Sequence, residues 1–309
     1  MQSKPPRTVK IAPTDSFAVT QADEEIRHKV PARRNKAKKY SKNKQERGQL
    51  ASDEQLPSEA QQRPNPLPVS FNIPTKTMSC ILHIETSTDV CSVALSQDGV
   101  CLHEEIDTNG RRHAEILAPF VEEAVSFADS HAIPLDAVSV SAGPGSYTGL
   151  RIGVSTAKGL CYGRDLKLIS IPTLKVLCTP ILLYREDIPD NALLCPMIDA
   201  RRMEVYTAIY DRALHEVVPT DAVIVNENSF AEILDKQPVF FFGNGADKCR
   251  DTLKHPNAHF IEGIVPKASN MLPLAERALA LNETEDVAYY EPFYLKQFVA
   301  GKSKNLLNG

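Results

Sequence analysis

Residues 141–153 read SAGPGSYTGLRIG and join an apolar, β-branched run to a long stretch of small residues. Glycine and proline punctuate a tight turn, and helical spacing begins directly after them, so the segment predicts a strand-to-helix corner. The free N–H groups at such a helix start can also hold an anion. The spacing of Gly143, Gly145 and Gly149 fits neither G-x-G-x-x-G nor a Walker loop with its Lys-Ser or Lys-Thr pair. A structural corner and a weak anion site therefore both remain open.

The elements before this corner are short and regular. Three apolar segments separated by brief turns, at 80–86, 91–97 and 100–107, predict a three-stranded antiparallel meander. Apolar residues then recur at helical spacing over 113–130 on an unusually wide face. Pro119 lies inside this pattern, so we expect the helix to start late or to kink. A buried strand is expected at 135–142.

The segment after the corner predicts a second helix. Residues 148–163 have helical spacing, with Thr148 as the expected cap and Gly163 as the expected end. Gly149, Gly153 and Ala157 fall on one line, four residues apart. Because glycine in a helix costs up to about 1 kcal/mol relative to alanine, we interpret this line as a surface for close packing against a neighbouring helix. Further strands are expected at 166–174 and, in a second sheet, at 192–200, 204–211 and 238–245.

The composition suits a globular protein but is uneven. The chain has 309 residues, 42% hydrophobic content and a net charge of −4, enough for one large core or two modest ones. It lacks an 18-residue apolar run and an apolar N-terminal segment, so we expect neither a membrane span nor a secretory signal, and the cytoplasm is the expected compartment. The seven cysteines are dispersed without a C-x-x-C pair. They are expected to be reduced and mostly buried.

The charge balance changes near Met78. Residues 1–77 hold 15 Lys and Arg against 8 Asp and Glu, which leaves 20 against 31 for residues 78–309, or charges of +7 and −11. The first segment is proline-rich with few apolar residues, so disorder is expected. Residues 1–77 are either a tether for nucleic acid or a tail without a partner. Such a tail is a solvated extension, or it is sequence translated from upstream of a natural start at Met78. We favour the tail. The tether would act through Arg33, Arg34, Lys36, Lys38 and Lys39.

Four motifs occur in order along the chain: ILHIETSTDVCSVAL (81–95), RRHAEILAPFVEEAV (111–125), VSAGPGSYTGLRIGVSTAKGL (140–160) and EPFYLK (291–296). Together they resemble the TsaB family, also called YeaZ. The resemblance spans residues 79 to about 296. It implies an α/β fold of the actin/Hsp70-like (ASKHA) class with mixed sheets in two subdomains, which we place at 78–178 and 179–309 after the extension 1–77. A late helix at about 270–282 could pack back on the first subdomain.

The resemblance also implies a function. It suggests a non-catalytic subunit that pairs with a TsaD-like catalytic subunit in N6-threonylcarbamoylation of adenosine 37 in tRNA, together with a TsaE-like ATPase. ATP and metal would be used by these partners, tRNA would be reached only through the complex, and no membrane would be involved. A homodimer is a further option. The alternative is an actin-like enzyme, either a small-molecule kinase or a glycoprotease-like hydrolase.

Departures from the catalytic homologue's pattern argue against chemistry in this chain. That homologue carries two metal-binding histidines four residues apart, whereas here Leu117 stands four positions after His113. Neither Glu115 nor His103 restores the spacing, and one imidazole cannot hold a catalytic metal, so we expect neither a metal site nor a catalytic residue. The Asp-Gly-Thr of actin-like ATPases is replaced by a Glu-Thr-Ser-Thr run that would crowd a phosphate. The weak candidates for residual nucleotide binding are Glu85, Thr86, Ser87, Gly143, Gly145 and Ser146.

The helices over 113–130 and 149–162 are expected to form a four-helix contact with the equivalent helices of a partner. Part of their apolar surface must bury in the chain's own core, and sequence does not divide the two sets. The turn Asp199-Ala200-Arg201-Arg202 and Glu204 either line a cleft or are solvated. The expected interface residues are Glu115, Leu117, Phe120, Val121, Ala124, Gly149, Arg151, Gly153, Val154 and Ala157.

Overall fold

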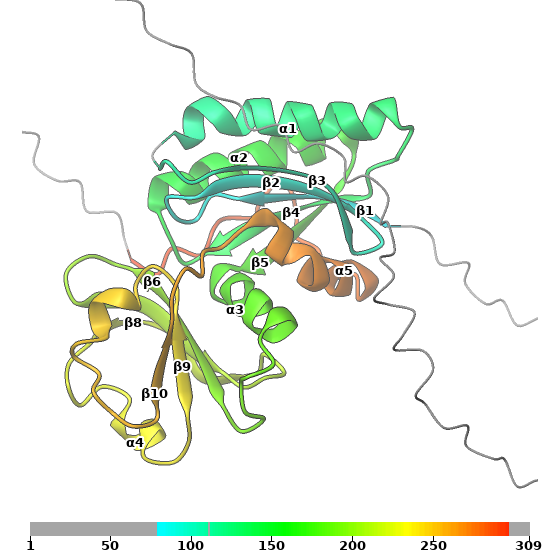
Figure 1. Cartoon of the computed structure of the whole chain (residues 1–309). Coiled ribbons are helices and arrows are strands. Elements are labelled where there is room, and N and C mark those ends of the chain that lie inside the picture. Colours follow the sequence, from blue (N-terminus) through cyan, green and yellow to red (C-terminus); the bar gives the residue numbers. More distant parts are fainter. Residues whose placement is uncertain (1–78, 111, 297–309) are drawn as a thin grey trace, which may run out of the picture. The chain divides into compact units, whose positions relative to one another are not determined.

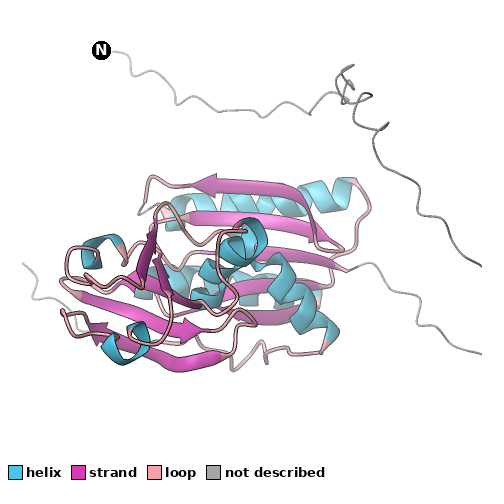
Figure 2. Cartoon of the chain, turned by 60° about the horizontal axis from the view of Figure 1, so that its bottom comes forward, coloured by secondary structure: helices cyan, strands magenta, loops and turns pink. Residues whose placement is uncertain are grey.

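The computed structural model describes residues 79–110 and 112–296. These residues lie within the second of two units of the chain, 1–70 and 71–309. The disorder expected for residues 1–77, and the basic cluster within them, fall outside the described residues. The second unit contains two five-stranded sheets with helices on their faces (Figure 1, Figure 2).

The first sheet has the strand order β3-β2-β1-β4-β5. Its antiparallel part, the predicted meander, is confirmed as β1 (Cys80–Glu85), β2 (Cys91–Gln97) and β3 (Val100–Asp107). β4 (Ala137–Gly143) pairs in parallel with β1, and β5 (Lys167–Pro172) pairs in parallel with β4. Parallel neighbours need long crossover connections, and helices provide them here.

Helices cover both faces of this sheet (Figure 1). α1 (His113–Ser130) and α2 (Tyr147–Arg164) bury their apolar sides on one face. On the other face lie α3 (Thr173–Tyr184), the 3-10 turn η4 (Ala268–Met271) and α5 (Leu272–Ala280). The sheet is therefore covered on both sides, and its central strands β1 and β4 are buried along their whole length.

Three details of the two predicted helices differ from expectation. α1 begins at His113 and runs through Pro119, so the late start is wrong. The side chain that caps α2 is Ser146, whose Oγ accepts a hydrogen bond from the Gly149 N–H, and not Thr148. α2 also passes through Gly163 and ends at Arg164, and Asp165 after it adopts the left-handed conformation that closes many helices.

The second sheet has the order β10-β9-β6-β7-β8. Predicted strands are confirmed as β6 (Leu193–Asp199), β7 (Glu204–Tyr210) and β9 (Val239–Phe242), whereas β8 (Glu216–Ile224) and β10 (Ala258–Ile261) were not expected. α3 packs against this sheet with one side and the first sheet with the other. The helix also spans the subdomain boundary expected between residues 178 and 179. Two short elements, α4 (Ala231–Leu234) and η3 (Asp247–Cys249), border the far face.

Cysteine chemistry agrees with the sequence. All seven cysteines are free thiols, six of them buried and Cys101 exposed. Burial raises the pKa of Cys80 to about 11 and, together with smaller effects of Asp107 and Glu85, that of Cys91 to about 12. Such thiols stay protonated and unreactive near neutral pH. No helix in the described ranges is long and apolar enough to cross a membrane.

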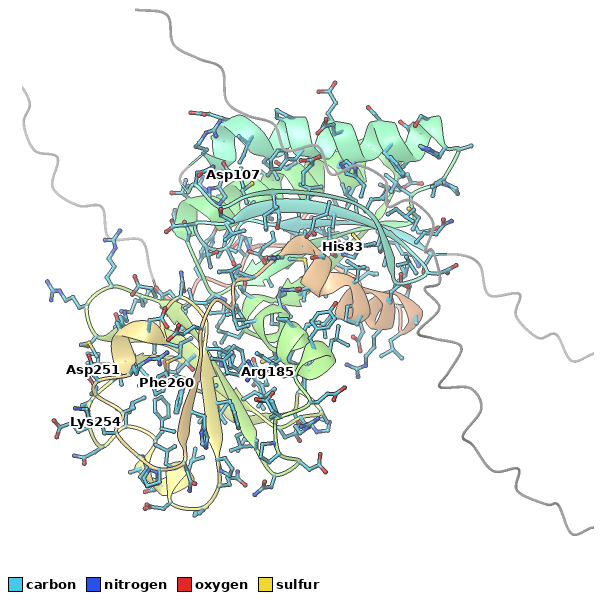
Figure 3. The ribbon with its side chains drawn as sticks, in the orientation of Figure 1. His83, Asp107, Arg185, Asp251, Lys254 and Phe260 are labelled. Atoms are coloured by element: carbon cyan, nitrogen blue, oxygen red, sulfur yellow. The ribbon has the colours of Figure 1, made fainter. Side chains whose placement is uncertain are left out.

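A histidine side chain lies deep inside the first sheet. His83 is fully buried on β1, with Nδ1 2.7 Å from the Ser139 hydroxyl and Nε2 2.8 Å from the Ser96 hydroxyl (Figure 3). A neutral imidazole donates from one nitrogen and accepts at the other, so the two serines satisfy it. Burial lowers the pKa of His83 to about 3 and keeps the ring neutral.

Candidate functional site

A cavity of about 990 Å³ lies where strands of both sheets end. Its walls come from the turn after β1, the corner between β4 and α2, the start of α1, the end of β6 and the turn after β9. In open α/β sheets, ligands bind outside the carboxyl ends of the strands. Residues that line the cavity include Ser87, His113, Gly145, Ser146, Tyr147, Asp199, Arg201, Asn244 and Tyr294.

Glu85, at the end of β1, does not line this cavity. Its carboxylate accepts hydrogen bonds from the Ser87 N–H at 2.6 Å, from the Ser87 hydroxyl at 2.5 Å and from the Ser141 hydroxyl. Burial raises its pKa, and the hydrogen bonds from Ser141 and Ser87 oppose that shift. The carboxylate thus ties the turn after β1 to β4.

Contacts with Thr86 explain why α2 has glycine at positions 149 and 153. The Thr86 hydroxyl donates to the Gly149 carbonyl at 2.8 Å. A Cβ added at Gly149 would lie much less than 3.0 Å from the Thr86 carbonyl oxygen. A Cβ added at Gly153 would lie similarly close to the Thr86 hydroxyl oxygen. The glycine line therefore lets α2 approach the end of β1, and the expected role in packing against another helix is wrong.

Gly145, just before α2, allows the same close approach between the start of α2 and the turn after β1. A Cβ there would fall well inside 3.0 Å of the Ser87 carbonyl oxygen, and the Ser146 N–H donates to that oxygen at 2.6 Å. Glycine allows this because it carries no side chain. The opening segment is consequently a tight corner whose shape depends on the turn after β1.

Both helices of this face begin at the cavity. Ser146, Tyr147 and Thr148 line it at the start of α2, and His113 and Ala114 line it at the start of α1. The His113 ring faces the Val90 carbonyl, with Nε2 3.2 Å from the oxygen, so it fastens the start of α1 to the turn before β2. Helix starts carry partial positive charge, which suits an anion.

The opposite wall is held by ion pairs. Lys248 donates to the Asp199 carboxylate and, at 2.7 Å, to the Glu204 carbonyl. Lys296 pairs with the Glu204 carboxylate. Of the charged turn singled out in the sequence, Asp199 and Arg201 line the cavity, whereas Glu204 is occupied by its ion pair beside it.

An aromatic pair at the rim was not expected from the sequence. The rings of Tyr147 and Tyr294 lie 4.7 Å apart, and the Arg151 guanidinium lies 5.5 Å from the Tyr147 ring centre. Arg151 also donates to the Tyr147 hydroxyl at 3.5 Å. The EPFYLK motif supplies Tyr294, but no sequence signal places it beside α2.

The candidate nucleotide-binding residues divide into two groups. Ser87, Gly145 and Ser146 line the cavity. Glu85 and Thr86 are buried in the packing described above, and Gly143 lies against the Phe293 backbone. The second group is not positioned to touch a ligand in the cavity.

Most of the expected interface residues belong to the chain's own core. Burial of seven of the ten corrects their assignment to a partner surface, because reaching a partner would require them to leave this core. Glu115 and Arg151 are exposed, and Phe120 is half-buried. The seven buried residues are Leu117, Val121, Ala124, Gly149, Gly153, Val154 and Ala157.

Among the residues that the structure describes, no group of three metal-ligating side chains lies in the cavity. Across the described ranges, the one group of three that could share an ion is His103, Glu105 and Glu123, on β3 and α1. None of the three lines the cavity. The arrangement in the cavity can therefore hold an anion at two helix starts, but residues 79–110 and 112–296 bring no triad of metal ligands to it.

Comparisons with known proteins identify the family of this chain. The family model described as "TsaD: tRNA N6-adenosine threonylcarbamoyltransferase" matches residues 106–303. The tRNA threonylcarbamoyladenosine biosynthesis protein TsaB of Escherichia coli K12 is 31% identical over 228 residues, which cover 72% of this chain and 96% of that protein. The chain belongs to the TsaB family. It thereby also falls among the TsaD-like proteins that the family model describes.

Other TsaB relatives agree with this assignment. TsaB of Haemophilus influenzae is 29% identical over 235 residues, covering 72% of this chain and 95% of that protein. The solved structure of YeaZ from Pseudomonas aeruginosa is 28% identical, with a TM-score of 0.60 over 71% of this chain and 100% of that one. The predicted actin-like α/β fold with two mixed sheets is confirmed.

Proposed function

We propose that the chain is a non-catalytic scaffold subunit that activates a TsaD-like catalytic subunit for N6-threonylcarbamoylation of adenosine 37 in tRNA. Support comes from the TsaB relatives, which are named for biosynthesis of this tRNA modification. The match to the TsaD family model supports a fold shared with the proposed partner. A TsaE-like ATPase completes the proposed cytoplasmic assembly, in which the partners use ATP and metal and tRNA is bound only through the complex.

The position of Glu85 supports the proposal that the chain is not catalytic. An acid at the end of the first strand would have to reach the cavity to act on a metal or a phosphate. Here the Glu85 carboxylate is fully buried and holds the Ser87 and Ser141 hydroxyls in place. The cavity therefore keeps its shape while this acid is committed to the packing beneath it.

The proposed docking surface is the outer face of α1 and α2. Small side chains on it allow close approach of partner helices, and charged ones at its edge can pair across the contact. This face replaces the buried residues of the original expectation. Its exposed members are Ala114, Glu115, Ala118 and Glu122 on α1 and Arg151, Ser155 and Gly159 on α2.

The test is to place a charge on this face without disturbing the core. Ala118→Arg and Ser155→Arg change exposed positions, so the fold should stay intact. Each should abolish pull-down of the TsaD-like partner and threonylcarbamoylation of tRNA in vitro, because an unpaired charge in a desolvated contact is costly. Ala280→Arg, at an exposed position of α5, is the matched control and should leave both unchanged.

Two outcomes would reject the proposal. If both arginine variants still bind the partner and support the modification, the contact lies elsewhere. If the chain alone releases phosphate from ATP with Mg²⁺ at about 1 per second or faster, a rate typical of enzymes, the alternative of an actin-like kinase or hydrolase is correct.

A homodimer that forms through the same face of α1 and α2 should be weaker in the same two arginine variants.

A further inference from the structure

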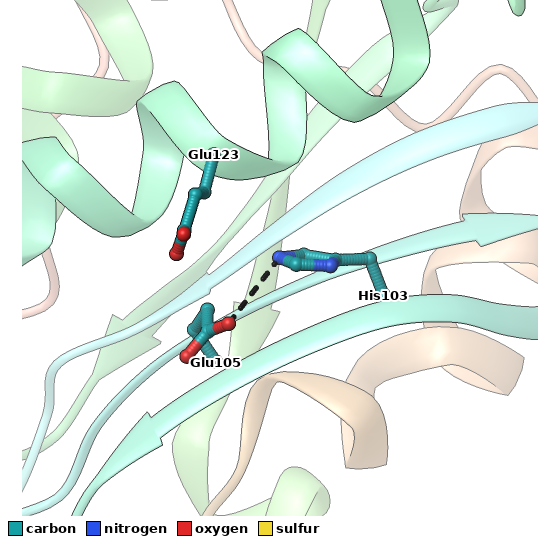
Figure 4. A group of neighbouring side chains, drawn as sticks. All are labelled: His103, Glu105 and Glu123. Carbon is teal, nitrogen blue, oxygen red and sulfur yellow. Dashed lines mark ion pairs between the residues drawn. The ribbon is translucent and has the colours of Figure 1, made fainter. Parts of the chain in front are cut away.

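A histidine and two glutamates meet at the edge of the first sheet (Figure 4), and none of them lines the cavity. His103 and Glu105 stand two residues apart on β3, so their side chains share one face of the strand. Glu123 reaches toward them from α1. One ligand atom of each residue lies within 4.8 Å of those of the other two.

The imidazole has a free position for a ligand. The His103 Nε2 atom is buried and has no hydrogen-bond partner within the described structure. It lies 3.7 Å from a Glu105 carboxylate oxygen, too far for a hydrogen bond. The ring is stacked 5.7 Å from the Phe127 ring, which restrains its orientation. Buried polar atoms are nearly always paired, so this atom is an exception that needs an explanation.

We propose that His103, Glu105 and Glu123 bind one divalent transition-metal ion, which links β3 to α1. One imidazole nitrogen and two carboxylate oxygens are ligands that Zn²⁺ accepts, at about 2.0–2.2 Å each. In a tetrahedral site of that size the ligand atoms lie about 3.4 Å apart. Rotation of the Glu123 side chain, which is exposed, closes the remaining gap.

The surroundings favour a cation over a chance cluster. Two carboxylates directed at one another repel, and a divalent ion between them removes that repulsion. The imidazole selects against Mg²⁺ and Ca²⁺, which prefer oxygen ligands alone. Exposure of Glu123 gives the ion an entry path from solvent and leaves a fourth position for water. The site rests on these side chains and is independent of the function proposed above.

The test is titration of the full chain with Zn²⁺ by calorimetry. We expect one high-affinity ion per chain, with binding at least tenfold weaker in His103→Gln and in Glu123→Gln. Glu122→Gln and His131→Gln are matched controls, because both residues are exposed neighbours outside the triad, and both should bind as the unchanged protein does. Cys101→Ser, which removes the exposed thiol on β3, should also keep the site.

A second measurement does not depend on heats of binding. Zn²⁺ should raise the melting temperature of the unchanged chain and of Glu122→Gln, but not of Glu123→Gln, because only an ion bound to the folded state stabilises it. The proposal is overturned if no ion binds, if His103→Gln and Glu123→Gln keep full affinity, or if Cys101→Ser removes it. Equal affinity for Mg²⁺ and Zn²⁺ would equally overturn it, since that would indicate a nonspecific acidic surface.

Discussion

The Thr86 hydroxyl donates a hydrogen bond to the Gly149 carbonyl at 2.8 Å, so the end of β1 lies directly on the first turn of α2. Gly149→Ala would drive a Cβ into the Thr86 backbone, and Gly153→Ala would drive one into the Thr86 hydroxyl. Overpacking of this kind costs about 1–3 kcal/mol of unfolding free energy and occasionally more. We expect Gly149→Ala to be the more harmful because backbone cannot turn aside. Urea denaturation measures both.

The same helix contains its own controls. At Gly159 and Gly163, a Cβ would have no atom within 4 Å apart from its chain neighbours and the nearby backbone of its own helix. Alanine there improves helix propensity without a clash, so each substitution should stabilise the chain by up to about 1 kcal/mol. If all four alanine variants shift stability in the same direction, the contact between Thr86 and the glycines does not explain the glycine line.

Local pattern was enough to predict the meander and the corner, because strand alternation and turn residues depend on near neighbours in sequence. It was not enough to assign the partners of the helices. Leu117 and Val121 would look alike in a core or in an interface, and the line of glycines would look alike beside a helix or beside a strand end. Only the fold shows that these residues face β1 and its neighbours.

α3 and the metal-ligand cluster show a second limit. α3 packs between two sheets, so its residues 173–184 are apolar on nearly every side and lack the amphipathic period that marks a helix. His103 and Glu105 alternate on one strand, a signal that sequence carries, but Glu123 joins them only through packing of α1. In the same way, the pairing of Tyr147 with Tyr294 depends on where the last described segment lies.

The buried His83 should make the fold sensitive to acid. Its pKa falls from 6.5 to about 3 on folding because burial disfavours the charged ring. Between these values the unfolded chain binds a proton that the folded chain does not, so stability falls as pH decreases from about 6.5 to about 3 and the loss then stops. One such proton contributes about 1.4 kcal/mol per pH unit.

His83→Gln isolates this effect. Glutamine keeps a donor and an acceptor for Ser139 and Ser96 but does not titrate. Its unfolding free energy should therefore fall less steeply over the same pH range in denaturation curves. Glu85 has the opposite effect on stability, because its raised pKa lets the folded chain bind a proton before the unfolded chain does as pH falls. Glu85 is present in both proteins, so its effect cancels in the comparison. Equal pH slopes in the two proteins would show that His83 is not the titrating group.

Glu85 should prove structural and not chemical. Glu85→Ala leaves the Ser87 and Ser141 donors unpaired and creates a new void where the Glu85 side chain was. We expect a loss of about 2–5 kcal/mol in unfolding free energy. Glu85→Gln keeps the shape and should be milder. In the reconstituted reaction, Glu85→Gln should modify tRNA at the unchanged rate per folded molecule. A folded Glu85→Gln protein with a rate reduced about 100-fold or more, the range expected on loss of an acid–base group, would assign it a chemical role.

Removal of residues 1–77 should leave the folding of the remaining chain intact. β1 begins at Cys80, and the segment before Met78 is rich in charge and proline and poor in apolar residues. A chain that begins at Met78 should keep a cooperative melting transition at the same temperature. A decrease of several degrees would mean that residues 1–77 contribute to the packing.

The same pair of proteins tests the RNA interpretation. Residues 78–309 carry a charge of −11 by the count given above, and phosphate binding needs positive charge, so this part alone should bind tRNA weakly. Titration of labelled tRNA at two salt concentrations measures this. If the full chain binds tightly and loses affinity at higher salt while the shortened chain does not bind, the basic segment around Arg33 to Lys44 is a tether, and the interpretation as a solvated tail is wrong. Tight, salt-sensitive binding by the shortened chain would instead place an RNA surface on the folded unit, and tRNA would not depend on the complex for its contact with this subunit.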